Sequence, residues 1–476
     1  MSAATHHTAT TDPGEDTIAA IATPPGAGGI GIVRISGPLA AAILTRLFRP
    51  RHPRKTLASH RLYYGWIADP SSGLPLDEVL AVHMHAPHTY TREDVVEIHC
   101  HGSYLVLQKI LGLVLAEGAR PAQAGEFTKR AFLNGRIDLT RAEAVLELLE
   151  ARTTAALHLA TAQLQGRLFQ EVSEIRAALL TVRAILEVAI DFPEDDVEIL
   201  DATALREKLA SEVRVPLAGL LAGADRGKIL RQGVAAVILG RPNVGKSSLL
   251  NTLLREERAL VTPVPGTTRD TIEEYIDIKG MPVRIVDTAG IRETRETVEE
   301  MGIKRARAKL AEADLVLLLL DASEPLTAED RQLYASIREQ NPATPLLLVL
   351  NKMDIAAGLD ITSYASAFGA EKLVCISARS GEGIDTLEDA IFELVTGRSD
   401  LQEPAVACAP NLRHQAALGK ALTACLQAEE GFLHGLPADL VAVDLQAILD
   451  HLADIIGETT TDDILDLIFS QFCIGK

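Results

Sequence analysis

Eight consecutive residues near the middle of the chain have the types and the spacing that bind a nucleotide phosphate. The segment from Gly240 to Ser247 fits the pattern G-x-x-x-x-G-K-[ST] and follows an apolar run of strand length. Its glycines let the backbone curl so that successive N–H groups face phosphate oxygens, its lysine adds a positive charge, and its final hydroxyl ligates Mg²⁺. We therefore predict a phosphate loop that leads into a helix and uses Asn243, Val244, Gly245, Lys246, Ser247 and Ser248.

Three further motifs follow, each at the end of an apolar run. The first offers a carboxylate for Mg²⁺ and a backbone N–H for a γ-phosphate. The second offers a carboxylate for the N–H donors of guanine, and the third a backbone N–H for guanine O6. Parallel strands bring such loops to one edge of a sheet, so the four motifs together predict GTP and not ATP. Their residues are Asp287, Thr288, Ala289, Gly290, Asn351, Lys352, Asp354, Ser377, Ala378 and Arg379.

Residues 262–270 lie between the phosphate loop and the motif at residues 287–290, and their pattern is typical of a GTPase switch segment. Thr268 is the natural threonine to complete the Mg²⁺ shell when a γ-phosphate is present. The residue after the motif at residues 287–290 is Ile291, which cannot orient the attacking water as a glutamine would. A carboxylate acting through a bridging water is the alternative. Four nearby residues qualify, and their chemistry does not choose among them: Glu293, Glu296, Glu299 and Glu300.

The transition state of hydrolysis also needs a positive charge. An arginine finger contributes roughly 10³–10⁵ in rate, or about 4–7 kcal/mol. A monovalent cation held by Asn243 and by oxygens of residues 262–267 would supply that charge. Arg269 or Arg292 acting in cis is the other possibility.

The elements that position these residues follow from the apolar pattern. Short apolar runs at residues 234–239, 283–286, 315–320, 346–350 and 373–376 suit parallel strands covered on both faces. Before them, residues 17–118 read as mixed structure with strands at residues 30–35, 79–84 and 95–101 and a helix at residues 103–117. Residues 140–232 and 413–472 read as amphipathic helices, broken near Phe192-Pro193. The simplest fold is α/β plus all-α, with one helical domain made from two segments and an α/β domain inserted into it.

Composition sets limits on the class of protein. The 476 residues carry 46 Lys and Arg against 65 Asp and Glu, a net charge of −19 that argues against a surface coated for nucleic acid. Five scattered cysteines indicate a reducing cytoplasm and no disulfide framework. The longest unbroken apolar run, residues 315–320, is far below the roughly 18 residues that span a membrane.

Several segments carry a resemblance to one known family. They are residues 22–26 (Ala-Thr-Pro-Pro-Gly), 125–127 (Gly-Glu-Phe), 130–135, 266–270 and the final Phe-Cys-Ile-Gly-Lys at 472–476. With the phosphate loop and the inserted domain, they make residues 17–476 resemble the MnmE (TrmE) family of bacterial tRNA modification GTPases. The domains expected are a disordered tail (1–16), an α+β folate-binding and dimerisation domain (17–135), a helical domain in two parts (136–232 and 399–476) and a Ras-like P-loop GTPase domain (233–398).

The resemblance implies an activity and its partners. Members form homodimers and, with the FAD-dependent protein MnmG, add a carboxymethylaminomethyl or aminomethyl group to carbon 5 of the wobble uridine of certain tRNAs. The one-carbon unit is expected from 5,10-methylene- or 5-formyl-tetrahydrofolate, and K⁺ stimulates GTP hydrolysis. The competing hypothesis is a GTPase that only assembles a ribosome or another ribonucleoprotein, but such proteins usually carry a compact basic module that this acidic chain lacks.

The resemblance also assigns residues. It selects Glu299 as the catalytic carboxylate that positions water. The Mg²⁺ ligands are Ser247 and Thr268, and the K⁺ ligands are Asn243, Thr262, Val264 and Thr267. The folate site is assigned to Arg34, Glu97, Arg136 and Lys476, with Cys473 as a possible further member.

Two other groups have weaker signals. His83, His85, His99 and His101 stand in pairs two residues apart, which would suit a metal but reads better as ordinary strand histidines. The basic residues Arg46, Arg49, Arg51, Arg54 and Lys55 would suit tRNA phosphates or, equally, a solvated loop.

Overall fold

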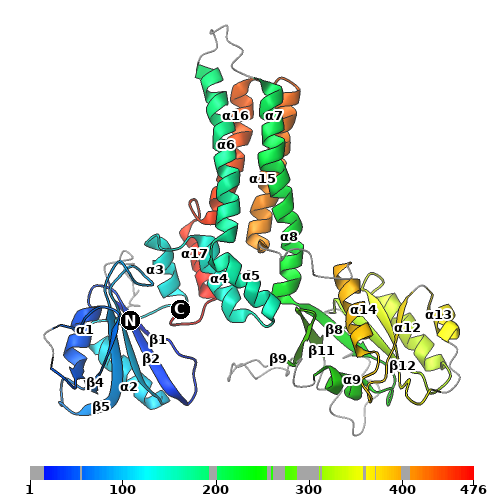
Figure 1. The fold of residues 1–476 in the computed structure, drawn as a ribbon, viewed down its shortest axis with the longest axis horizontal. Helices are drawn as coiled ribbons and strands as arrows, with labels where there is room; N and C mark the ends of the chain where they lie inside the picture. Colours follow the sequence, from blue (N-terminus) through cyan, green and yellow to red (C-terminus); the bar gives the residue numbers. More distant parts are fainter. Residues whose placement is uncertain are drawn as a thin grey trace, which may run out of the picture. The chain divides into compact units, whose positions relative to one another are not determined.

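A computed structural model describes residues 16–53, 56–191, 201–254, 259–260, 274–286, 310, 313–356, 361–369, 371–397 and 408–476. These residues form two compact units, which we describe separately (Figure 1). The N-terminal unit ends at Leu146 and also contains Leu452–Lys476, whereas the second unit is Glu147–His451. The predicted domain limits stay predictions, but the end of the chain belongs to the same compact unit as its beginning.

The N-terminal unit is built on a mixed sheet with the strand order β3-β4-β5-β6-β2-β1-β7. Its strands are β1 (Ile18–Ile21), β2 (Gly28–Ser36), β3 (Phe48–Pro50), β4 (Arg61–Ala68), β5 (Pro75–Met84), β6 (Val95–Gly102) and β7 (Arg120–Pro121). Alternate residues of β2 and β6, such as Val33 and Ile98, are buried on one face against α1 (Ala40–Leu47) and α2 (Tyr104–Ala116). The predicted strands in β2, β5 and β6 and the predicted helix in α2 are confirmed.

The opposite face of this sheet has a different cover. Near β1 and β7 it packs on Phe127 of α3 (Glu126–Leu133), together with Ile18 and Ala20. Beyond it, α17 (Asp462–Ser470) packs through Phe469 on Leu139, the first residue of α4 (Leu139–Glu150). This packing delivers the last residues of the chain to α3.

The second unit contains an α/β layer structure with the strand order β14-β13-β12-β8-β11-β10-β9. The strands are β8 (Val234–Leu239), β9 (Ala259–Leu260), β10 (Glu274–Ile278), β11 (Met281–Val286), β12 (Leu315–Asp321), β13 (Leu346–Asn351) and β14 (Lys372–Cys375). From β14 to β11 all neighbours are parallel, whereas β9 and β10 pair antiparallel. The five apolar runs are therefore strands, as predicted.

Helices cover both faces of this sheet because its strands are apolar on both sides. One face packs on α9 (Lys246–Leu253) and α14 (Ile384–Thr396). The other packs on α12 (Ala328–Gln340) and α13 (Ile361–Phe368). Every residue of β12 is buried, both the six apolar residues 315–320 and the final Asp321.

The rest of the second unit is helical. Its helices are α5 (Thr154–Leu164), α6 (Arg167–Asp191), α7 (Ala202–Leu209), the π-helical turn η1 (Ala210–Arg214), α8 (Val215–Gln232), α15 (Leu412–Leu433) and most of α16 (Ala438–Ile456). The chain passes from α8 directly into β8 and returns at Ala409, whose carbonyl oxygen accepts a 2.6 Å hydrogen bond from Nη1 of Arg231 at the end of α8. The α/β region thus leaves and rejoins the helices at one place. No helix among the described residues is both long enough and apolar enough to cross a bilayer.

Candidate functional site

The predicted phosphate loop has the backbone geometry that its sequence requires. Residues 240–245 connect β8 to α9, and φ is positive at Gly240 (+154°), Asn243 (+65°) and Gly245 (+101°). A Cβ at Gly240 would lie 2.4 Å from the Leu319 carbonyl oxygen, and one at Gly245 would lie 2.2 Å from Nδ2 of Asn351. Only glycine fits at these two positions, and left-handed residues of this kind turn backbone N–H groups toward a common centre. The loop therefore fits a phosphate group.

Lys246 lies across this loop at the start of α9. Its Nζ donates 2.8 Å hydrogen bonds to the carbonyl oxygens of Gly240 and Arg241. Burial lowers the pKa of the Lys246 ammonium group, because a charge is costly away from water. An anionic phosphate would remove that cost. Ser247 follows on the first turn of α9 and is half-buried, and its role as a Mg²⁺ ligand stays a prediction.

Asn351 ties the phosphate loop to the loop that follows β14. Its Nδ2 donates to the Val244 carbonyl oxygen at 2.8 Å, and its Oδ1 accepts from the Ala378 N–H at 2.9 Å. The Asn351 side chain is buried. The Ala378 carbonyl oxygen in turn accepts a 2.6 Å hydrogen bond from Oγ1 of Thr252 in α9. Three of the four motifs predicted to bind GTP are thus joined directly.

Asp354 has a fixed place in the same group. Its Oδ1 accepts a 2.8 Å hydrogen bond from the hydroxyl of Ser377, which is fully buried. The second carboxylate oxygen is the natural acceptor for the N–H donors of guanine. Arg379 is exposed, and only its main chain follows the base-side loop.

Nine of the predicted residues lie outside the described part of the chain, so their roles stay predictions. They are Thr262, Val264, Thr267, Thr268, Asp287, Thr288, Ala289, Gly290 and Glu299. The other candidate carboxylates and the candidate fingers Arg269 and Arg292 lie there too.

In the N-terminal unit, Arg34 and Glu97 are directly opposite each other on β2 and β6. Nε of Arg34 donates to Oε1 of Glu97 at 2.9 Å, and the other carboxylate oxygen of Glu97 is 3.2 Å from Nε2 of His99. The Arg34 guanidinium also lies over the Phe127 ring, 5.7 Å from its centre. Both side chains are about a fifth exposed, at 22% and 18%, so they face a partly open surface.

The last residues of the chain join this pair. Nη1 of Arg34 donates to the Gly475 carbonyl oxygen at 3.1 Å. The main-chain oxygen of Lys476 accepts from the Phe127 N–H at 3.1 Å, while Ile474 forms a β-bridge with Ala124. Arg34 and Glu97 thus form one group with the main chain of Gly475 and Lys476, whereas Cys473 is exposed.

Arg136 approaches the same apolar cluster from another side. Its guanidinium lies over the ring of Tyr90, 4.7 Å from the centre, and its Nη1 is 3.3 Å from the Tyr90 carbonyl oxygen. Tyr90 packs on the cluster that contains Phe127. Arg34 and Arg136 therefore rest on two aromatic rings of one cluster.

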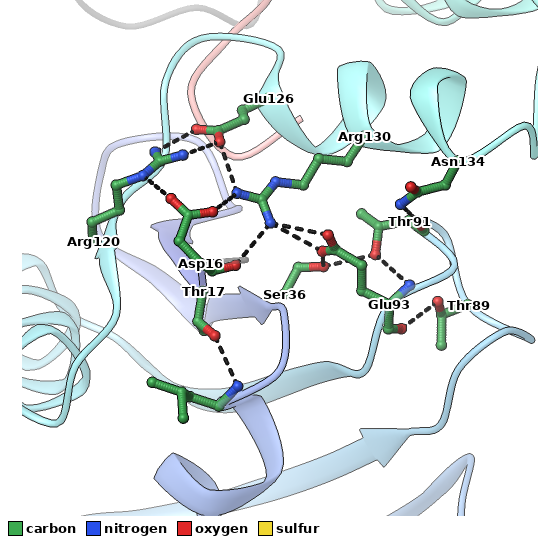
Figure 2. A network of polar contacts seen from close by, with 11 residues as sticks. Asp16, Thr17, Ser36, Thr89, Thr91, Glu93, Arg120, Glu126, Arg130 and Asn134 are labelled. Carbon is green, nitrogen blue, oxygen red and sulfur yellow. Dashed lines mark hydrogen bonds and ion pairs between the residues drawn. The ribbon is translucent and has the colours of Figure 1, made fainter. Parts of the chain in front are cut away.

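A buried ionic network beside this site was not predicted (Figure 2). Arg130 of α3 is only 3% exposed and binds three carboxylates: Asp16 at 2.6 Å, Glu93 at 3.0 Å and Glu126 at 3.0 Å. Arg120 pairs with Asp16 and Glu126. Although burial alone would raise the pKa values of the Asp16 and Glu126 carboxyl groups, hydrogen bonds from the two arginines lower both below their ordinary values. The network fixes α3 against the start of β1.

The same network anchors the loop that carries Tyr90. The other carboxylate oxygen of Glu93 accepts a 2.6 Å hydrogen bond from the Ser36 hydroxyl, and Nδ2 of Asn134 donates to the Thr91 carbonyl oxygen at 2.6 Å (Figure 2). Residues 125–127 and 130–135 were noted above only as family signatures. Only Arg120, Glu126 and Arg130 are near one another in the sequence, whereas Asp16 and Glu93 are distant from them, so the sequence held no local signal for the whole network.

The remaining charged groups give no metal centre in the part of the chain that the structure describes. His101 binds Asp77 at 2.8 Å, and Nε2 of His85 is 3.0 Å from Nδ1 of His83. Arg46 pairs with Glu117, and the Arg51 guanidinium lies over the Tyr64 ring. The proposed role of these basic residues in binding tRNA stays a prediction.

Comparison with known proteins adds information about the family. The family model for the MnmE helical domain matches residues 139–473, and the model for the GTP-binding protein TrmE N-terminus matches residues 17–136. The chain is 51% identical to the tRNA modification GTPase MnmE of Desulfotalea psychrophila over 466 residues, or 97% of this chain and 98% of that relative. It is 48% identical to the tRNA modification GTPase MnmE of Geobacillus kaustophilus over 464 residues, or 97% of this chain and 99% of that relative.

Proposed function

Because the chain belongs to the MnmE family, and is therefore a GTP hydrolase that acts in tRNA modification, we propose a specific reaction for it. Together with the FAD-dependent protein MnmG, it adds a carboxymethylaminomethyl or aminomethyl group to carbon 5 of the wobble uridine of certain tRNAs in the cytoplasm. A tetrahydrofolate derivative is the source of the one-carbon unit. GTP hydrolysis, with Mg²⁺ and K⁺ as cofactors, drives this modification reaction.

One observation carries the folate part of this proposal. The end of the chain lies against the Arg34–Glu97 pair, because Arg34 bonds both to Glu97 and to the Gly475 carbonyl oxygen. Arg34 and Glu97 therefore face one partly open surface, with the end of the chain beside them. A pterin presents N–H donors that suit Glu97, and the carboxylates of a folate glutamate tail suit Arg136 and Lys476. Arg34 holds Glu97 and the end of the chain in place through its two hydrogen bonds. With Arg136 and Lys476, it would be the third positive charge near the ligand.

In the nucleotide site, the described residues hold the phosphates and the base. Lys246 and the backbone of residues 240–245 neutralise and orient the phosphates, and Asp354 selects guanine. Ser247 and Thr268 would hold Mg²⁺, which stabilises the charge that develops on the phosphate oxygens. Asn243, Thr262, Val264 and Thr267 would hold K⁺ in place of an arginine finger. Glu299 would position the attacking water through a second water.

The homodimer that we propose would use the open face of the N-terminal sheet. Leu62 and Trp66, two of the apolar residues of β4 on that face, are 53% and 42% exposed. Leu80 of β5, opposite Tyr64, extends this surface. A contiguous exposed apolar surface of this kind is typical of a protein–protein contact, and a second copy would cover it.

The most informative experiment is nucleoside analysis of tRNA from cells that lack this chain. We expect the 5-substituted wobble uridine to disappear and to return when the wild-type chain is restored. The variants Glu97→Gln and Glu299→Ala should not restore it, although both should still bind GTP. An unchanged nucleoside profile in the cells lacking the chain would contradict the proposed reaction.

The role of K⁺ has a separate test. We expect purified protein to hydrolyse GTP at least about tenfold faster in KCl than in NaCl of equal ionic strength, since the cation supplies part of the finger's roughly 10³–10⁵ effect. Equal rates in the two salts would rule out the cation site and leave Arg269 and Arg292 as candidates.

A further inference from the structure

Lys352, in the loop after β13, turns its side chain back toward the neighbouring strand. Its backbone φ is +67°, in the left-handed region that non-glycine residues rarely adopt. Its Nζ donates to Oδ2 of Asp321, the last residue of β12. The strained backbone and the ion pair together fix the orientation of the Lys352 side chain.

Asp321 is itself held rigidly. Asp321 is the register partner of Asn351, and the Asn351 carbonyl oxygen accepts a 2.9 Å hydrogen bond from the Ala322 N–H. The other carboxylate oxygen of Asp321 accepts from the N–H and the hydroxyl of Ser323 at 2.9 and 2.6 Å. The Asp321 side chain is only 5% exposed, whereas that of Lys352 is 30% exposed. The fixed partner is therefore the carboxylate, and the adjustable one is the lysine.

The charge on Asp321 is maintained in spite of burial. Burial alone would raise its pKa, but the hydrogen bonds from Lys352 and Ser323 lower it below the ordinary value. At neutral pH the carboxylate is ionised and attracts the lysine. Because the Asp321 carboxylate is almost excluded from solvent, its attraction for the lysine is screened less than that of a pair with both groups at the surface.

Lys352 lies between two residues that shape the nucleotide site. Asn351 before it is bonded to Val244 of the phosphate loop, and Asp354 after it is bonded to Ser377 of the base-side loop. The four-carbon stem of a lysine covers apolar surface while its charged end is held elsewhere. With its end fixed at Asp321, Lys352 would offer this stem to one face of a purine.

We propose that Asp321 is a positioning residue of the guanine nucleotide site, acting only through Lys352. This inference rests on the proposed role of Lys352 in that site. It goes beyond the four motifs, because Asp321 lies in none of them and does not touch the nucleotide itself.

A double-mutant cycle on the full chain tests the proposal. The dissociation constants of a fluorescent GDP and the KM and kcat for GTP are measured for wild type, Asp321→Asn, Lys352→Met and the double variant. Because a methionine cannot bond to Asp321 and its side chain would no longer be fixed over the base, we expect Lys352→Met to weaken GDP binding roughly 10- to 100-fold. Asp321→Asn should weaken it about tenfold and should raise KM more than it lowers kcat. The double variant should bind no worse than Lys352→Met alone.

A matched control separates this effect from general loss of an ion pair. Glu371 pairs with Arg338 before β14 begins, at the opposite edge of the same sheet, and its side chain is 19% exposed. Glu371→Gln should change GDP binding less than twofold. Because a buried charge without its partner can unfold a domain, Asp321→Glu serves as a second variant. It keeps the charge but changes its reach, and it should weaken GDP binding several-fold.

The outcomes distinguish two failures. Normal GDP binding by Lys352→Met would overturn the proposed role of Lys352 and, with it, this inference. Weak binding by Lys352→Met beside normal binding by both Asp321 variants would overturn the role of Asp321 alone. A double variant that binds as weakly as the product of the two single effects would show that Asp321 does not act through Lys352.

Discussion

The nucleotide site and the candidate folate site are assembled in different ways. In the nucleotide site, each contributing loop follows a strand, and the strands are parallel neighbours that end at one edge. In the candidate folate site, the contributing groups come from β2, β6, α3 and the end of the chain. In the nucleotide site, the position of each loop follows from the position of its strand in the sheet. The candidate folate site forms only when several packing contacts between distant segments form together.

The hydrogen bonds and ion pairs that hold each site together also differ in kind. Asn351 uses one side chain to join two main-chain groups, the Val244 carbonyl and the Ala378 N–H. Around α3, by contrast, Arg130 joins side chains of Asp16, Glu93 and Glu126. Neutral bonds to the main chain are modest individually, whereas a buried charge that loses its partner is costly. The second site should therefore be the more sensitive of the two to single substitutions.

The largest expected effect is that of Arg130→Met. Three carboxylates would lose their buried partner, so we expect the N-terminal unit to lose about 3–5 kcal/mol of unfolding free energy. The only tryptophan of the chain, Trp66, lies in β4, so its fluorescence during urea unfolding reports on this unit. Binding of GDP, measured without denaturant, should stay normal.

A matched control for that prediction is Arg46→Met. Arg46 pairs with Glu117, but its side chain is 64% exposed, so the loss should be below about 1 kcal/mol. Equal losses for the two variants would mean that burial of the network has no energetic consequence, and the comparison between the sites would fail.

Asn351→Ala should have the next largest effect, and it should be confined to the nucleotide site. The Val244 carbonyl and the Ala378 N–H would each lose a buried hydrogen bond, at about 1–3 kcal/mol apiece. We expect GDP binding to weaken at least about 30-fold by the same principle, with the Trp66 unfolding midpoint unchanged. Asn351→Asp keeps the acceptor but sets a buried carboxylate oxygen against the Val244 carbonyl oxygen, so it should show a defect at least as large. A shift in the Trp66 midpoint would show that the two units do not respond separately.

Gly475→Ala tests the link between the chain end and the sheet. Gly475 has φ +95°, and a Cβ there would lie 2.5 Å from the Ile21 carbonyl oxygen. The strain of about 1–3 kcal/mol should displace the chain end and weaken binding of 5-formyl-tetrahydrofolate roughly 5- to 150-fold in equilibrium dialysis. Gly397→Ala is the control, since Gly397 also has positive φ (+68°) but has no atom within 4 Å of the added carbon. Normal folate binding by Gly475→Ala would separate the chain end from the proposed folate site.

The smallest effect concerns acid. The pKa values of the Asp16 and Glu126 carboxyl groups are below their ordinary 3.8 and 4.5, so their stabilising contribution is complete above those values and is lost as the pH falls through the lowered ones. We expect the Trp66 unfolding midpoint to be flat from pH 7 to 5.5 and to fall below about pH 4.

Asp277 of β10 in the α/β region should respond with the opposite sign. Burial raises the pKa of its carboxyl group, so this group stabilises the folded α/β region at low pH, and that contribution is lost as the pH rises through the raised pKa.

The control for the acid response of the N-terminal unit is Arg130→Met, which should flatten the acid response of the Trp66 signal. An unchanged response in that variant would assign the acid sensitivity to other groups.

The α/β region was largely predictable because its signals are local. The five apolar runs are strands, since a strand covered on both faces has few polar positions to confuse with other structure. In the N-terminal unit, β4 was not predicted, because it combines the exposed apolar residues Leu62 and Trp66 with the buried Ile67 and so lacks clean alternation. Helix α3 was not predicted either, because its buried Glu126 and Arg130 suggest a surface segment.

The sequence alone predicted the strand–loop–helix unit around Lys246 and the choice of GTP, because each of the motifs involved is a short run of neighbouring residues. It also carried the family signature at both ends of the chain. Only the tertiary structure decided that Arg34 meets Gly475, which is 441 residues away, and that Arg130 is buried among three carboxylates. Such meetings follow from the packing of α17 on α4 and of Phe127 on β1, and packing between distant segments has no fixed spacing in a sequence.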